Sequence, residues 1–163
     1  MSDTVLGRLP NGDEIAAWRS FLRAHARVTR CLEADLIAKQ RLSLAAYDVL
    51  VHLAEAPEQR LRMTELADAV LLSRSGVTRL VDRLERVGLV RRVRVDTDGR
   101  GVMAVLTKQG KDRLRMAVST HLAGVSQYFT SVLPGEELGS LADTCAKLAD
   151  GQVPRAASQR AQA

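Results

Sequence analysis

Arginine and hydroxyl side chains gather on one side of a helix predicted over residues 73–87. At about 100° per residue, the apolar side chains of this segment share one narrow face. Guanidinium groups neutralise phosphates and hydroxyls fit against base edges, so the opposite face suits DNA. An ordinary amphipathic helix with solvated arginines explains the same pattern, and this helix alone does not separate the two interpretations. The apolar face comprises Val77, Leu80, Val81, Leu84 and Val87, and the opposite face comprises Ser75, Thr78, Arg79, Asp82 and Arg86, flanked by Arg74 and Arg83.

A basic strand is predicted directly after this helix. Gly88 lies where a helix ends on a residue with positive φ, a conformation that glycine adopts without strain. Residues 89–95 then alternate between apolar and basic side chains, a pattern typical of a β-strand. Val93 and Val95 lie on one side of the predicted strand, and Arg92 and Arg94 lie on the other.

A tight turn over residues 96–101 and a β-rich segment over residues 102–106 complete a hairpin. Arg100 near the tip is suited to a narrow minor groove, where negative potential is concentrated. Asp98 can orient that guanidinium through a bidentate pair. Thr107 is placed to cap the next helix. A helix followed by a basic hairpin is the order of a winged helix, and it favours DNA binding over a merely solvated helix.

The residues upstream complete a helix-turn-helix. Residues 64–71 form a short predicted helix with Thr64 as its N-cap, and residues 71–73 form the turn. Ser73 or Ser75 caps the helix that follows. The inward residues of the short helix are Leu66, Ala67 and Val70, and those of a preceding helix over residues 43–55 are Leu44, Tyr47, Leu50, Val51 and Ala54.

Four segments of the chain resemble the multiple-antibiotic-resistance regulators, the MarR family: LSLAAYDVLVHL, MTELADAV, SRSGVTRLVDRLERVGLVRR and DTDGRGVMAVLTKQGKDRL. The resemblance runs from residue 12 to residue 150 and is most specific over residues 62–114. Within that range, Asp98-Gly99-Arg100 is similar to the family's wing element, and Leu106-Thr107-Lys108-Gln109-Gly110 to the start of its next helix. The chain departs from the family at Leu71, where a small residue or glycine is more usual.

The resemblance implies a single domain over residues 1–150, mainly α with a small β-hairpin wing. Residues 43–106 form the winged helix-turn-helix lobe, and residues 12–40 and 108–150 form N- and C-terminal dimerisation helices that interlock between two subunits. The first of these helices would be about 40 Å long, longer than the lobe needs for its own core. A plain monomeric helical cap is the alternative. We expect residues 151–163 to be a disordered tail, because they have no periodic apolar pattern.

Charge and composition agree with DNA binding. The net charge is +5, and residues 60–101 hold ten basic and six acidic side chains, with every basic one an arginine. A symmetric homodimer would bind a pseudo-palindromic operator with half-sites about 10 bp apart. No apolar run approaches the roughly 18 residues of a membrane span, so we expect a cytoplasmic protein. The predicted DNA contacts are Ser73, Arg74, Ser75, Thr78, Arg79, Arg83, Arg86, Arg94, Asp98 and Arg100.

The resemblance also implies a transcriptional regulator, expected to be a repressor, whose DNA affinity is lowered by a small aromatic or phenolic effector. The effector site would be a crevice between the dimerisation helices and the lobe. We expect Trp18, His25 and Tyr47 to line it, with apolar walls and few polar anchors. Core packing is the alternative for Trp18 and Tyr47, because both lie on apolar stripes. The stripe of the first helix comprises Ile15, Trp18, Leu22, Ala26, Thr29, Leu32 and Leu36.

The sequence predicts no enzyme, metal site or cofactor. His25, His52 and His121 fall in separate helices without zinc-type spacing, and the glycines form no phosphate-binding loop. Cys31 and Cys145 lie among apolar neighbours, where we expect small buried hydrophobes. A regulator that senses oxidation through Cys31 is one alternative function. A winged helix that binds an acidic protein partner is another.

Overall fold

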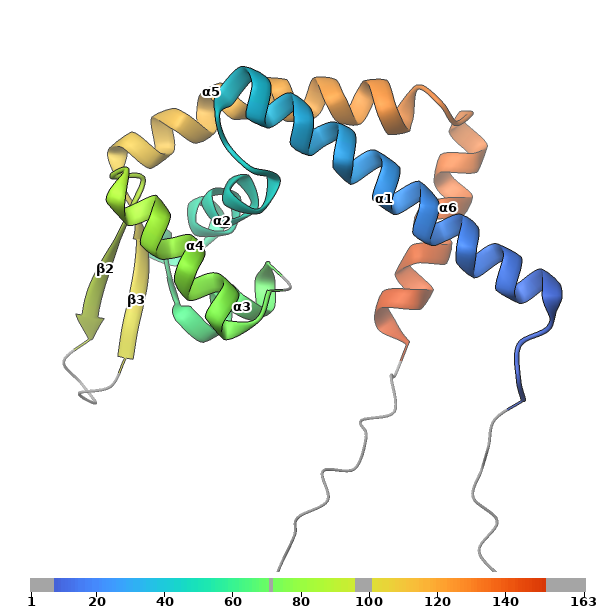
Figure 1. Cartoon of the computed structure of the whole chain (residues 1–163), viewed down its shortest axis with the longest axis horizontal. Helices are drawn as coiled ribbons and strands as arrows, with labels where there is room; N and C mark the ends of the chain where they lie inside the picture. The colour runs from blue at the N-terminus through green and yellow to red at the C-terminus, as the bar shows by residue number, and fades with distance from the viewer. Residues whose placement is uncertain (1–7, 71, 96–100, 152–163) are drawn as a thin grey trace, which may run out of the picture.

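The computed structural model describes residues 8–70, 72–95 and 101–151. In Figure 1, two long helices, α1 and α5, run side by side above a lobe formed by α2, α3, α4 and the sheet, and α6 lies away from that lobe. The elements in chain order are α1 (Gly12–Gln40), α2 (Leu44–Glu55), the 3-10 turn η1 (Pro57–Gln59), β1 (Arg60–Arg62), α3 (Met63–Ala69), α4 (Arg74–Arg86), β2 (Val90–Val95), β3 (Gly101–Leu106), α5 (Lys108–Val125), the π-helical turn η2 (Ser126–Thr130) and α6 (Gly135–Asp150).

This arrangement confirms the predicted fold class, mainly α with a small β wing. Three details of the sequence prediction lie outside the described residues. They are Leu71 in the helix-turn-helix turn, residues 96–100 of the hairpin turn with Asp98 and Arg100, and residues 152–163 of the predicted tail.

The N-terminal helix α1 begins at a capping box. The Asn11 side chain accepts a hydrogen bond from the Glu14 N–H (2.9 Å), and the Glu14 carboxylate accepts one from the Asn11 N–H (2.7 Å). The helix ends at Arg41, whose φ of 50° is left-handed. Only Leu32 and Leu36 of the predicted apolar stripe are buried. The N-terminal half of α1 therefore extends beyond the lobe's core.

One hydrophobic core fills the lobe. Its most deeply buried side chains come from α1, α2, α3, α4, β2 and β3, and helix α5 adds Ala117. Burial of each large aliphatic side chain stabilises the fold by about 1.5–3 kcal/mol. The largest fully buried side chains are Leu36, Leu50, Leu53, Leu66, Val49, Val77, Val81 and Val90.

The sheet has three antiparallel strands in the order β1-β3-β2, so the predicted two-stranded hairpin is incomplete. The missed strand, β1, has only three residues, too few to show an alternating pattern. Its Arg60 pairs with Val105 and its Arg62 with Met103, both on β3. β1 thus ties the segment between α2 and α3 to the wing, and leaves β2 as an edge strand.

Helix α3 begins two residues earlier than a helix capped by Thr64 would. The N-cap is Arg62, not Thr64, which lies inside the helix. The Glu65 carboxylate accepts a hydrogen bond from the Arg62 N–H (2.9 Å), so the acidic side chain of the first turn caps the helix. Leu66 and Ala67 are buried as predicted, and Val70 packs against the core.

A junction of three residues joins α4, β2 and α5. Gly88 has a φ of 74°, as its place after the helix predicts. Thr107 caps α5 by accepting a hydrogen bond from the Gly110 N–H (2.9 Å), and its hydroxyl lies 2.7 Å from the Gly88 carbonyl oxygen. A Cβ at Gly110 would lie 2.1 Å from the Leu89 carbonyl oxygen. The start of α5 is therefore fixed against the base of the wing.

A buried histidine lies between α2 and α5. The His121 ring stacks on Tyr47 with 4.5 Å between ring centroids, and its Nδ1 is buried with no hydrogen-bond partner among the described residues. Burial lowers the pKa of His121, and the Asp48 carboxylate opposes that shift. Burial in turn raises the pKa of Asp48, against the opposing charges of His121 and His52 and with the like charge of Glu33.

We predict that acidification destabilises the chain through His121. The unfolded chain binds a proton on this ring near the ordinary pKa of about 6.5, whereas the folded chain binds it only at lower pH, so stability falls as the pH drops below that value. Urea unfolding at pH 7.5, 6.5 and 5.5 measures the effect. His121→Phe, which keeps an aromatic ring against Tyr47, should lose less stability over the same range. Equal losses in both proteins would contradict this assignment.

Candidate nucleic-acid interface

Helix α4 presents its basic residues on the face that the core does not use. Ser73 caps the helix through a 3.1 Å hydrogen bond from the Gly76 N–H, so the cap alternative with Ser75 is settled. The predicted inward residues Val77, Leu80, Val81 and Leu84 are buried. Val87 is not part of that face, because it follows the helix as its C-cap and is 58% exposed. The exposed residues of the opposite face are Arg74, Ser75, Thr78, Arg79, Arg83 and Arg86.

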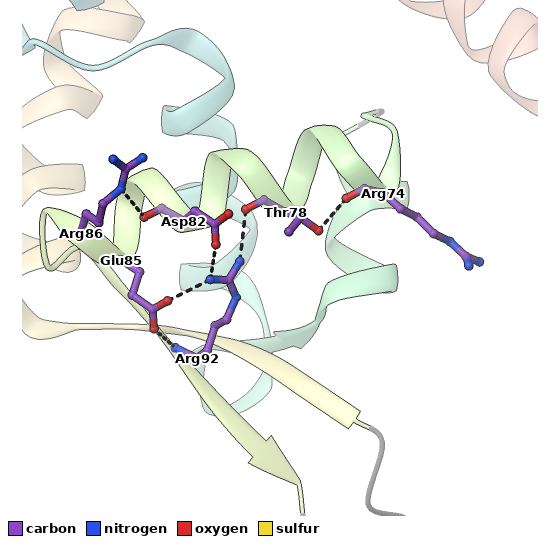
Figure 2. A network of polar contacts seen from close by, with 6 residues as sticks. All are labelled: Arg74, Thr78, Asp82, Glu85, Arg86 and Arg92. Atoms are coloured by element: carbon purple, nitrogen blue, oxygen red, sulfur yellow. Dashed lines mark hydrogen bonds and ion pairs between the residues drawn. The ribbon is translucent and has the colours of Figure 1, made fainter.

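Several of these side chains already make hydrogen bonds within the helix. The Ser73 and Ser75 hydroxyl oxygens lie 3.2 Å apart, and the Thr78 hydroxyl donates to the Arg74 carbonyl (2.9 Å). Arg86 Nε donates to the Asp82 carbonyl (3.3 Å), whereas the Arg74 side chain points away from the helix in Figure 2. The Ser73 hydroxyl is therefore used to cap the helix, whereas the Thr78 hydroxyl oxygen still has lone pairs that can accept a hydrogen bond from a partner.

Arg92 on β2 joins the wing to α4, an interaction that the sequence reasoning missed. Its Nη1 donates to Asp82 Oδ1 (2.5 Å) and Glu85 Oε2 (2.9 Å), and its Nη2 donates to the Thr78 carbonyl (3.1 Å; Figure 2). The Arg92 N–H also donates to Glu85 Oε1 (2.8 Å). One arginine thus neutralises both carboxylates of α4 and fixes the angle between helix and strand.

The alternation of β2 explains why Arg92 lies there. Val90 is buried, and Arg92 lies two residues later on the same side of the strand, facing α4. Asp82 and Glu85 are three residues apart, which places them on one side of their helix. The two-residue spacing on β2 and the three-residue spacing on α4 are the sequence features from which this contact could have been predicted. The predicted separation of Arg92 from Val93 is confirmed, and the arginine side is the one that packs against the helix.

The wing contributes one described residue of the predicted DNA contacts. Arg94 is exposed on β2. Asp98 and Arg100 lie outside the described residues, so their placement stays a prediction.

A second concave site lies between α1 and α2. This open groove has a volume of about 540 Å³, and its polar groups include His25, Arg30 and Glu33. Asp48 also lines it, and burial raises the pKa of that carboxyl. Glu33 accepts a hydrogen bond from the Leu44 N–H, which holds the start of α2 against α1. The remaining lining residues are Ala26, Thr29, Leu44 and Ala45.

Of the three predicted effector-site residues, only His25 lines this groove. Trp18 lies toward the N-terminal end of α1, is 56% exposed and has its ring centroid 6.1 Å from that of Phe21. Tyr47 is buried and stacks on His121. The core alternative therefore holds for Tyr47 and fails for Trp18. A role of Trp18 and Tyr47 in an effector site stays a prediction.

The cysteines differ from each other and from the prediction. Cys31 is half-buried, whereas Cys145 is exposed, because α6 has no buried residue. Within the described ranges, no three His, Cys, Asp or Glu side chains cluster as a metal ion would require. None of the described helices combines the length and hydropathy of a membrane span.

Comparison with known proteins places this geometry in a family. The family model of the MarR family matches residues 42–101. The chain is 33% identical over 148 residues to an HTH-type transcriptional regulator of Bacillus cereus, which covers 91% of this chain and 92% of that protein. Over 89 residues it is 34% identical to the HTH-type transcriptional repressor YetL of Bacillus subtilis, covering 55% of this chain and 53% of YetL.

Solved structures agree along nearly the whole chain. Sco3205, a MarR family transcriptional regulator from Streptomyces coelicolor solved in complex with DNA, is 35% identical with a TM-score of 0.84, covering 93% of this chain and 96% of that one. AbsC, a second MarR family regulator from the same organism, is 34% identical with a TM-score of 0.78, covering 90% and 100%. The chain therefore belongs to the MarR family: it is a DNA-binding transcriptional regulator and not an enzyme.

Proposed function

We propose that this chain is a homodimeric repressor that binds a pseudo-palindromic operator and is released by a small aromatic or phenolic effector. The exposed basic face of α4 carries the proposal, because its arginines stand on a helix held by the core on one side and by Arg92 on the other. Such a face can enter a major groove without reorganising. The resemblance to YetL, which is named a transcriptional repressor, supports repression over activation.

Arg79 is the proposed base-reading residue. It lies midway along the exposed face of α4, and no hydrogen bond to another described residue engages its side chain. A bidentate arginine–guanine contact discriminates against the wrong base by about 1–3 kcal/mol. The hydroxyls of Ser75 and Thr78 lie on the same face, and the exposed Arg74, Arg83 and Arg86 are the proposed phosphate contacts.

Exposed apolar side chains support the dimer. Trp18, Phe21 and Leu22 lie close together along α1, each at least 43% exposed, and Leu148 on α6 is 64% exposed. Exposed apolar side chains of this kind do not help solubility. We therefore propose that a second copy of the chain packs against them and buries them. Two copies would present two α4 helices about one helical turn of DNA apart.

The groove between α1 and α2 is the proposed effector site. Its walls combine aliphatic groups with His25 and Arg30, which suit a carboxylate or a phenol hydroxyl. The groove lies between α1, part of the proposed dimer surface, and α2, part of the lobe. An effector that binds one arrangement of these helices more tightly would shift DNA affinity by that difference alone.

Arg79→Ala should cost about 1–3 kcal/mol of operator affinity and relax base preference at one position. The operator is a duplex recovered from a random-sequence pool by repeated binding to the unchanged chain, and fluorescence anisotropy gives the dissociation constants. Arg115→Ala is the matched control, because Arg115 is exposed on α5 and pairs with Asp112 (2.8 Å). Unchanged affinity and base preference in Arg79→Ala would reject the assignment.

Trp18→Glu should convert the dimer to a monomer. Light scattering of the unchanged chain should give twice the chain mass of 17.8 kDa, and the variant should shift toward the single mass because a carboxylate cannot be buried unpaired. Val87→Glu makes the same kind of change at an exposed apolar residue of the lobe and should keep the double mass. If the unchanged chain is monomeric at all concentrations, the proposal of a homodimer on a symmetric operator is wrong.

A further inference from the structure

A hydrogen bond joins the long helix α1 to the start of α2. The half-buried Glu33, on α1, accepts it through its carboxylate from the Leu44 N–H, the first amide of α2. Among residues 8–70, the structure gives no other hydrogen bond between these two helices. The first turn of α2 has no acidic residue of its own, so Glu33 supplies the negative charge that favours a helix N-terminus. The start of α2 is therefore stabilised in part by a residue of another element.

Helix α1 is joined more firmly to α5 than to α2. The Gln40 side chain donates to the Thr120 hydroxyl (2.9 Å), and Arg113 Nη1 donates to the Gln40 carbonyl (2.9 Å). The Tyr128 hydroxyl, in the turn η2 after α5, donates to Asp35 Oδ2 (3.0 Å). These three hydrogen bonds hold the two long helices together. A movement of α1 relative to the lobe would therefore break its contact with α2 first.

The groove proposed as the effector site opens directly on the hydrogen bond between α1 and α2. Both partners of that bond, Glu33 and Leu44, line the groove together with Arg30. Arg30 precedes Glu33 by three residues, so the two side chains share one side of α1. An effector carboxylate bound by Arg30 would lie near the Glu33 carboxylate and repel it. The groove thus places an acidic ligand where it weakens the contact between the helices.

We propose that Glu33 couples the groove to the lobe as a positioning residue: its hydrogen bond to Leu44 holds the lobe in the arrangement that binds DNA, and an acidic effector breaks that bond. The inference rests on the proposed function, because it assigns the regulation of the groove proposed there as the effector site. Helix α2 packs against α3 and the sheet, so a displaced α2 moves the elements that hold α4. Close-packed interiors transmit such displacements instead of absorbing them.

Three variants test the coupling by their affinity for the selected operator, measured by fluorescence anisotropy. Glu33→Ala removes the bond and should lower affinity by at least about tenfold, a common size for coupling between sites. Glu33→Gln keeps an oxygen that accepts from the Leu44 N–H and should keep most of the affinity. Ser43→Ala is the matched control. It removes the hydroxyl that accepts from the Ala46 N–H (3.1 Å) at the same helix start, leaves α1 joined to α2, and should bind the operator normally.

Benzoate, an aromatic carboxylate, is the probe for the groove, with equal concentrations of sodium chloride as the salt control. It should release the unchanged chain from the operator. It should have little further effect on Glu33→Ala, because that variant already lacks the bond that benzoate breaks. Glu33→Gln should bind the operator and resist release, because a neutral amide is not repelled by a carboxylate. A residue that only stabilises the fold would not alter the response to benzoate in this way.

The outcomes separate this inference from the proposed function. Unchanged operator affinity in Glu33→Ala, or an equal loss in Ser43→Ala, would overturn the inference while the operator contact stands. Equal release of Glu33→Ala and the unchanged chain by benzoate would also overturn it. Failure of the unchanged chain to bind any duplex would overturn both. If benzoate does not release the unchanged chain, an aromatic acid is the wrong effector class, and the comparison of Glu33→Ala with Ser43→Ala still decides whether Glu33 positions the lobe.

Discussion

The proposed DNA-binding surface depends on the position of Arg92. Helix α4 carries two carboxylates, Asp82 and Glu85, beside the arginines that we propose contact phosphates, and the Arg92 guanidinium lies within 2.9 Å of both. The same group donates to the Thr78 carbonyl, so helix and strand are joined by backbone as well as charge. The Arg92 side chain is 24% exposed, whereas Asp82 and Glu85 are 48% and 39% exposed, so solvent screens these ion pairs in part. One residue thus sets both the charge and the geometry of the surface.

The rest of the lobe holds that surface in place. The core side of α4 is fixed by buried aliphatic residues, and the Gly88–Thr107–Gly110 junction anchors the base of β2 and β3 to α5. Helix α5 packs along α1, whose exposed half is the proposed dimer surface. A change in the packing of α1 against α2 would therefore act on the proposed DNA-binding face through packed helices, which is the physical basis for the proposed effect of an effector.

Much of this fold could be predicted from local patterns. The apolar period of α4 from Val77 to Leu84, the glycine at position 88 and the cap at Thr107 each depend on neighbouring residues, and all three are confirmed. The features that could not be predicted from the sequence involve contacts between distant segments. Strand β1 is short and is stabilised by pairing with β3, about forty residues later in the register. The Arg92 contacts span up to fourteen residues. The separation of Trp18 from Tyr47 depends on how far α1 extends past the lobe.

A double-mutant cycle on operator affinity tests the central role of Arg92 most directly. The four proteins are the unchanged chain, Asp82→Asn, Arg92→Ala and the double variant, each first shown to be folded. Arg92→Ala should lose about tenfold or more in affinity, and Asp82→Asn should raise affinity far more in that background than in the unchanged chain, with a coupling of about 1 kcal/mol. An equal effect of Asp82→Asn in both backgrounds would contradict the account, because it would mean that Arg92 does not shield the carboxylate.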